Sequence, residues 1–147
     1  MISKVLPVAT RVLLGLVFFV FGLNGFLQFL PQPPMPAGAM PFLGGLAGAG
    51  YFFPLLKSIE VAAGVLLLSN RFVPLALTLL APIVVNIAAF HLALAPNPVM
   101  VVFLLAAEIY LAWSYRDAFR GVLAARARPA VARTSAEVGE RAVAIAK

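Results

Sequence analysis

Long apolar runs, broken at only a few points, dominate this sequence. No charged side chain occurs from Val12 to Leu56, and prolines between Pro31 and Pro41 divide that run into two parts. Because roughly 20 apolar residues cross the hydrocarbon core of a bilayer, the first part predicts a membrane span at about 10–29. Further apolar segments predict spans at about 51–69, 72–94 and 99–115.

These segments predict an all-α protein, a four-transmembrane-helix antiparallel bundle that occupies residues 1–122. The connections at Asn70-Arg71 and Pro96-Asn97-Pro98 are short, as between antiparallel neighbours. The loop 31–50 is rich in Pro and Gly, and we expect a short interfacial helix near Met40–Leu46 within it. A cleaved signal peptide is the alternative for the first span, but its apolar run continues through Leu30 without an A-x-A-like site directly after it.

The basic residues predict the orientation of these spans. Lys4 and Arg11 lie at the start of the first span, Arg71 lies between the second and third, and Arg116 follows the fourth. The loops 31–50 and 95–98 carry no Lys or Arg. Because cytoplasmic loops are enriched in basic residues, both termini are predicted to be cytoplasmic.

Composition supports a membrane protein and excludes several kinds of chemistry. The chain is 63% hydrophobic and 11% charged, whereas soluble domains carry about 25% charged residues. Most of the net charge of +6 lies after residue 115. We therefore expect residues 123–147 to form a basic cytoplasmic tail, flexible or a short amphipathic helix, with the lipid bilayer and not nucleic acid as its partner. The absence of cysteine excludes disulfides, CxxC redox couples and cysteine-ligated metal centres.

Ionisable residues inside the spans are costly to insert, at about 2.5–3.5 kcal/mol for each central charge. Lys57 and Glu60 are spaced i,i+3 on one helical face, so they are close enough to pair. Gly64 extends this face, and Gly15 and Gly22 mark a matching stripe on the first span. Small residues let helices approach closely, so these glycines predict helix packing.

Polar residues on all four spans are predicted to lie in the outer half of the membrane. At about 1.5 Å per residue from the outer ends, their depth is roughly 5–13 Å. The set comprises Asn24, Lys57, Glu60, Asn86, His91 and Glu108. They line a pocket open to the outer side in one interpretation and form a structural network in the other, with His91 at the interface. A single His and two carboxylates on different helices argue against a metal site.

Four segments together resemble the DoxX family of small bacterial integral membrane proteins over about residues 8–122. They are RVLLGLVFFVFGLNGF (11–26), YFFPLLKSIEVAAGVLLLSNRFVPLAL (51–77), APIVVNIAAFHL (81–92) and EIYLAWSYRDAF (108–119). The resemblance implies a four-helix, multi-pass protein of the bacterial cell (inner) membrane with links to redox and quinone-stress functions. It also implies a quinone as the candidate cofactor, and a redox partner protein or a homo-oligomer as the candidate assembly.

Three functional hypotheses follow. In the first, an outward-facing pocket binds a quinone or another small amphipathic ligand, with Lys57 and Glu60 as its floor. In the second, the protein is a non-catalytic accessory or assembly factor. In the third, it is a small transporter or channel subunit, although no charged residue in the inner half of a span marks a continuous polar path. None of these hypotheses assigns a catalytic residue.

The loop charges generate a prediction about topology. A reporter that is active only in the periplasm should work when fused after Ala39 and fail when fused after Ala124. Activity measured in whole cells checks this, with the expression of each fusion as the control. The reverse result would contradict the predicted orientation and the depths counted from it.

Overall fold

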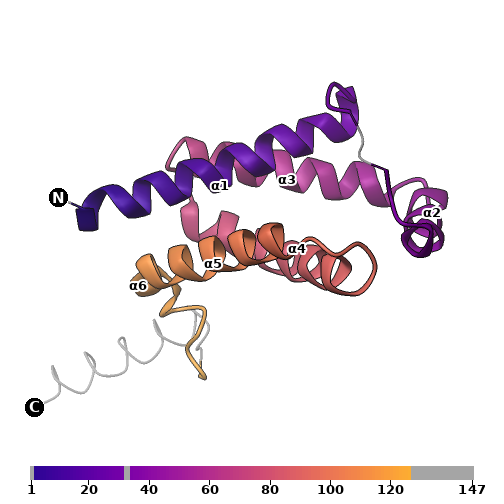
Figure 1. The fold of residues 1–147 in the computed structure, drawn as a ribbon. Coiled ribbons are helices and arrows are strands. Elements are labelled where there is room, and N and C mark those ends of the chain that lie inside the picture. Colours follow the sequence, from indigo (N-terminus) through magenta and orange to yellow (C-terminus); the bar gives the residue numbers. More distant parts are fainter. Residues whose placement is uncertain (1, 32–33, 127–147) are drawn as a thin grey trace, which may run out of the picture. The chain divides into compact units, whose positions relative to one another are not determined.

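The computed structural model describes residues 2–31 and 34–126 (Figure 1). All regular secondary structure in this part of the chain is helical, which confirms the predicted all-α class for these residues. The helices are α1 (Ile2–Leu27), η1 (Ala37–Ala39), α2 (Met40–Gly48), α3 (Phe52–Leu68), α4 (Val73–Ala93), α5 (Pro98–Ser114) and α6 (Arg116–Phe119). Residues 123–126 follow α6, and the rest of the predicted tail lies outside the described residues.

Two described helices are long and apolar enough to cross a membrane, namely α1 over Val5–Leu27 and α4 over Val73–Ala93. A third candidate is the pair formed by Ala37–Gly48 and Phe52–Leu68, which is bent by 90° at the break between α2 and α3. Helix α5 is apolar and has 17 residues, near the lower limit of about 17–25 for a spanning helix. The chain is therefore a membrane protein by length and composition, and the crossing of all four predicted spans stays a prediction.

Residues with turn conformations or capping side chains lie at the ends of several helices. Gln28 and Asn70 adopt left-handed backbone conformations directly after α1 and just beyond α3, and Asn tolerates this conformation well. Phe72 also has a positive φ of 52° and begins the turn into α4. The side chain of Asn97 accepts a hydrogen bond from the Met100 amide at 3.2 Å, which caps the start of α5.

Residues up to Arg116 and the described residues from Asp117 onward belong to separate compact units. Within the first unit, α1 packs against α3, α3 against α4, α4 against α5, and α5 against α1. Figure 1 shows α1 and α3 running alongside one another. The core between these helices is built largely from leucines, with Leu14, Leu67, Leu80 and Leu104 all nearly or fully inaccessible.

The contact between α1 and α3 is exceptionally close because both helices present glycine. A Cβ atom on Gly64 would lie 2.7 Å from the backbone nitrogen of Phe19. A Cβ atom on Gly22 would lie 2.8 Å from Val61 Cγ2, and one on Gly15 would lie 3.0 Å from Leu67 Cβ. All three glycines assigned to helix packing from the sequence thus lie where these two helices meet.

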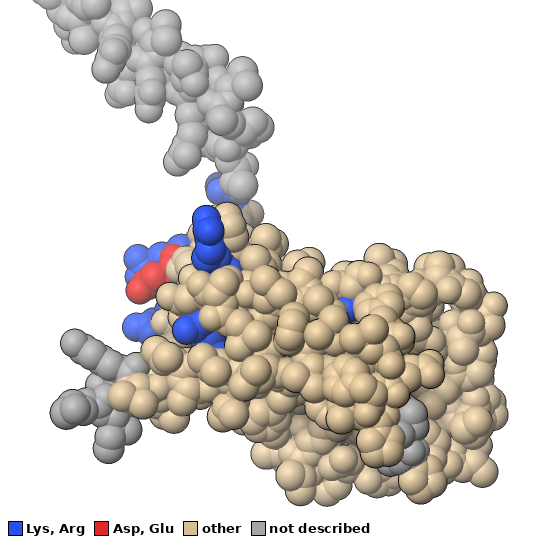
Figure 2. All heavy atoms as spheres, turned by 90° about the horizontal axis from the view of Figure 1, so that it is seen from above, with Lys and Arg blue, Asp and Glu red and all other residues tan. Residues whose placement is uncertain are grey.

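The outward faces of the helices are apolar. Val85, Val102 and Ile109 each expose more than 60% of their surface. In Figure 2, most of the visible surface of the described residues carries no charged side chain. Monomeric soluble proteins rarely expose apolar patches of this extent, so these faces suit contact with lipid.

The packing at Gly64 generates a prediction about stability. Gly64→Ala should lower the free energy of unfolding by about 1–3 kcal/mol, because the new methyl group meets rigid backbone of α1. Gly45→Ala in α2 is the matched control, since nothing lies within 4 Å of its Cβ position. Thermal unfolding in detergent checks both variants. A Gly64→Ala protein as stable as the Gly45→Ala protein would contradict the close contact.

Candidate functional site

Lys57 and Glu60 form an ion pair on α3 in which Glu60 is buried and Lys57 is partly buried. The Nζ atom of Lys57 lies 2.7 Å from Oε2 of Glu60, and the two side chains are 23% and 3% exposed. Gly22 and Gly25 of α1 lie directly against this pair, with Gly22 facing Glu60 Cβ and Gly25 facing the Lys57 stem. Because these two positions of α1 carry no side chain, α1 can pack directly against the ion pair and shield it.

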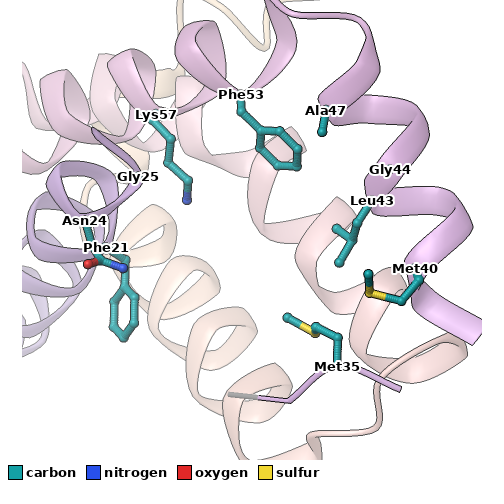
Figure 3. A pocket seen from close by; sticks show the side chains of 10 residues that line it. All are labelled: Phe21, Asn24, Gly25, Met35, Met40, Leu43, Gly44, Ala47, Phe53 and Lys57. Carbon is teal, nitrogen blue, oxygen red and sulfur yellow. The ribbon is translucent and has the colours of Figure 1, made fainter. Parts of the chain in front are cut away.

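A cavity of about 550 Å³ lies between α1, α2 and α3, beside the Lys57 ammonium. Figure 3 shows Lys57 and Phe53 pointing into it from α3, with Leu43 and Met40 of α2 on another side. Its lining is largely apolar. The remaining lining residues are Phe21, Asn24, Gly25, Met35, Gly44 and Ala47.

Two side chains bring hydrogen-bond donors to this larger cavity. An ammonium group has three N–H donors, and the ion pair with Glu60 uses one of those on Lys57. The Oδ1 atom of Asn24 accepts a bond of 2.7 Å from the Leu30 amide, and Figure 3 shows the amide nitrogen of Asn24 on the cavity side. The cavity therefore offers donors to a ligand that carries acceptors.

A second cavity, of about 170 Å³, lies on the α4 side of Lys57. Glu60, Asn86 and His91 line it together with Lys57. The His91 Nδ1 atom lies 2.8 Å from the carbonyl oxygen of Ala95. Because a carbonyl oxygen only accepts, Nδ1 carries the hydrogen, and in the neutral ring Nε2 is an acceptor. The smaller cavity thus combines acceptor groups with an aromatic wall formed by Phe42, Phe52, Phe53 and Phe90.

Glu108 lies apart from the other five candidate residues. It is buried on α5, between Leu104 and Leu111 on the same helical face, and it lines neither cavity. Its Oε2 atom has no hydrogen-bond partner among the described residues. Glu108 is also nearer to the C-terminal end of α5 than to Pro98. Because Glu108 lines neither cavity and makes no hydrogen bond at Oε2 among the described residues, we leave it out of the ligand site.

Arg11 is a buried polar residue whose role the sequence analysis missed. The sequence predicts only that its charge sets the topology, yet Arg11 is just 7% exposed. Its guanidinium donates to the carbonyl oxygen of Leu67, in the last turn of α3. A cation is favourable at this negative end of the helix dipole. Arg11 precedes Gly15 by four residues, so the glycine stripe itself was the available signal.

The sequence gives little indication that the other residues lining the larger cavity belong to a site. Gly25 continues the stripe three residues after Gly22. Met35 and Met40 come from an uncharged segment without periodicity, and only the bend between α2 and α3 brings Met40 over the ion pair. Within the described residues, no group of three or more His, Asp or Glu side chains is arranged to hold a metal ion.

Comparisons with known proteins give no match for this chain. No family model, curated protein or solved structure matches it. The case for a function therefore depends on the chemistry of the two cavities and on the ion pair between them.

The burial of the ion pair generates a third prediction. Lys57→Met should destabilise the protein by about 3–5 kcal/mol, because it leaves the Glu60 carboxylate buried without its counter-charge. The double variant Lys57→Met/Glu60→Leu should be more stable than either single variant. A double-mutant cycle on thermal unfolding in detergent measures the coupling. A coupling below about 0.5 kcal/mol would mean that the two side chains act independently.

Proposed function

We propose that this protein binds a small amphipathic ligand with a hydrogen-bond-accepting head, such as a quinone, in the larger cavity. The observation that carries the proposal is the position of Lys57. It lines both cavities and pairs with Glu60, in a chain whose spans are otherwise almost free of charge. Charged residues inside a membrane are rare and usually functional.

We also propose an arrangement of the helices in the membrane and a relationship to the DoxX family. The four helices α1, α3, α4 and α5 form an antiparallel membrane bundle with both termini cytoplasmic, in the inner membrane of a bacterium. The protein is DoxX-like, with a redox partner protein or a second copy as its candidate assembly. The loop charges, the four apolar helices and their contacts support this arrangement.

Size favours the larger cavity over the smaller one. Small-molecule sites usually measure about 300–1,000 Å³, and the larger cavity, at about 550 Å³, falls in this range. The smaller cavity, at about 170 Å³, is below it. The smaller cavity beside Phe52 and Phe90 is therefore too small for the ring and tail of a quinone. In the larger cavity Phe21, Phe53 and Met40 offer an apolar wall of sufficient size.

The ion pair gives the site its selectivity. Lys57 and Asn24 donate to the carbonyl oxygens of the ligand, while Glu60, which lines the smaller cavity, holds the ammonium in position. A site built to donate hydrogen bonds rejects analogues that lack the acceptor, because its donors are then left unpaired. We propose binding alone and assign no catalytic residue.

A binding experiment tests this function. A short-chain quinone should raise the midpoint of thermal unfolding of the wild-type protein in detergent. Lys57→Met/Glu60→Leu should abolish this shift, because it removes the donor without leaving an unpaired charge. Met40→Trp should reduce it, because the larger indole occupies part of the cavity while the ion pair remains.

Ser58→Ala provides the control on the same helix. Ser58 is exposed and bonds only to the carbonyl oxygen of Pro54, so this variant should respond to the quinone as the wild type does. An unchanged response in both cavity variants would overturn the proposal. An accessory role carried out through the surface would then be the better account.

A further inference from the structure

We infer that the groove between α1 and α5 binds one anionic phospholipid, with an acyl chain in the groove and the phosphate at Arg116. This site is separate from the two cavities around Lys57. It combines an apolar channel, hydroxyl groups and an arginine held on an aromatic ring.

The groove has a volume of about 310 Å³ and faces outward between the two helices. Leu6 and Thr10 line it from α1, and Val102, Phe103 and Ala106 are among its lining residues on α5. The hydroxyl groups of Thr10 and Tyr110 are its polar side-chain groups. This lining suits an acyl chain, and hydroxyl groups suit the ester carbonyl oxygens that join the chain to glycerol.

The same face of α5 leads from the groove to a positive charge. Ala106, Tyr110 and Trp113 are spaced i, i+4 and i+7, so they lie on one side of the helix. Trp113 is 69% exposed, and the Arg116 guanidinium lies 5.3 Å from the centroid of its ring. Tryptophan is enriched at the membrane–water interface, which is where a phospholipid carries its phosphate.

Arg116 is prepared to bind an anion. A guanidinium carries five N–H donors, and one of those on Arg116 donates to the carbonyl oxygen of Trp113 at 3.2 Å. Arginine binds phosphate through parallel hydrogen bonds. Stacking on the indole restricts the side chain before the lipid arrives, which reduces the entropy lost on binding. An apolar groove that leads to a cation suits a phospholipid, which joins acyl chains to an anionic phosphate.

Native mass spectrometry of the whole 147-residue chain tests this inference. The protein in detergent is mixed with palmitoyl-oleoyl phosphatidylglycerol or with phosphatidylcholine that has the same chains. The wild type should retain phosphatidylglycerol more strongly. Arg116→Gln should weaken that binding about fivefold, which is the effect of one basic residue near an anionic membrane surface. Ala106→Phe should reduce the binding of both lipids, because it fills the groove.

Arg71→Gln is the matched control, since it removes the same charge from the exposed turn between α3 and α4. It should bind phosphatidylglycerol as the wild type does. Equal losses in Arg71→Gln and Arg116→Gln would overturn the site in favour of general charge attraction. Binding of free glycerol phosphate at the affinity of the lipid would also overturn it, as would a dimer that Ala106→Phe disperses.

Ala106 is exposed, so its larger variants should fold. Thermal unfolding of each variant verifies this, and Ala106→Leu serves as a smaller obstruction if the Phe variant unfolds early. Retention of both lipids by a folded groove variant would overturn the inference. Loss of quinone binding at Lys57 would not affect it, because the two sites share no residue.

Discussion

The close contact between α1 and α3 is the constraint on which the rest of the structure depends. A lysine and a glutamate in an apolar helix are tolerated only when each satisfies the other and both are shielded. Gly22 and Gly25 remove the side chains that would otherwise occupy this space, so that α1 lies directly against Glu60 and Lys57. The ion pair and these glycines therefore depend on each other, because the close helix contact that the glycines permit is what shields the pair.

The two cavities are a consequence of how the chain arrives at this contact. Asn24 closes the end of α1 by accepting from Leu30, and the chain then runs through the loop to α2, which meets α3 at 90°. A short helix set across the end of α3 cannot fill the space above Lys57. The larger cavity is therefore left between α2 and the ion pair, while the smaller one is left toward α4.

The basic residues of this chain have different roles because their surroundings differ. Lys57 has spare donors and faces a cavity, so it suits ligand binding. Arg11 is also buried, but its guanidinium donates to the carbonyl oxygen of Leu67 near the end of α3. It therefore stabilises that helix. Arg116 remains at the surface on Trp113, where it suits a lipid phosphate. Basic residues thus stabilise packing or suit ligand binding according to which of their donors the neighbouring groups leave unsatisfied.

Sequence alone determined the helical class and placed α3, α4 and α5 to within a residue or two, because long apolar runs and turn residues such as Pro98 and Asn70 act locally. It also determined the Lys57–Glu60 pair, since i,i+3 spacing fixes that contact within one helix. It did not place the start of α1, which begins at Ile2 and not near residue 10. The separation of Glu108 from the cavity residues, and the cavity itself, depended on how helices cross. That geometry follows from side-chain packing between distant segments, such as Gly64 against Phe19, which no local pattern encodes.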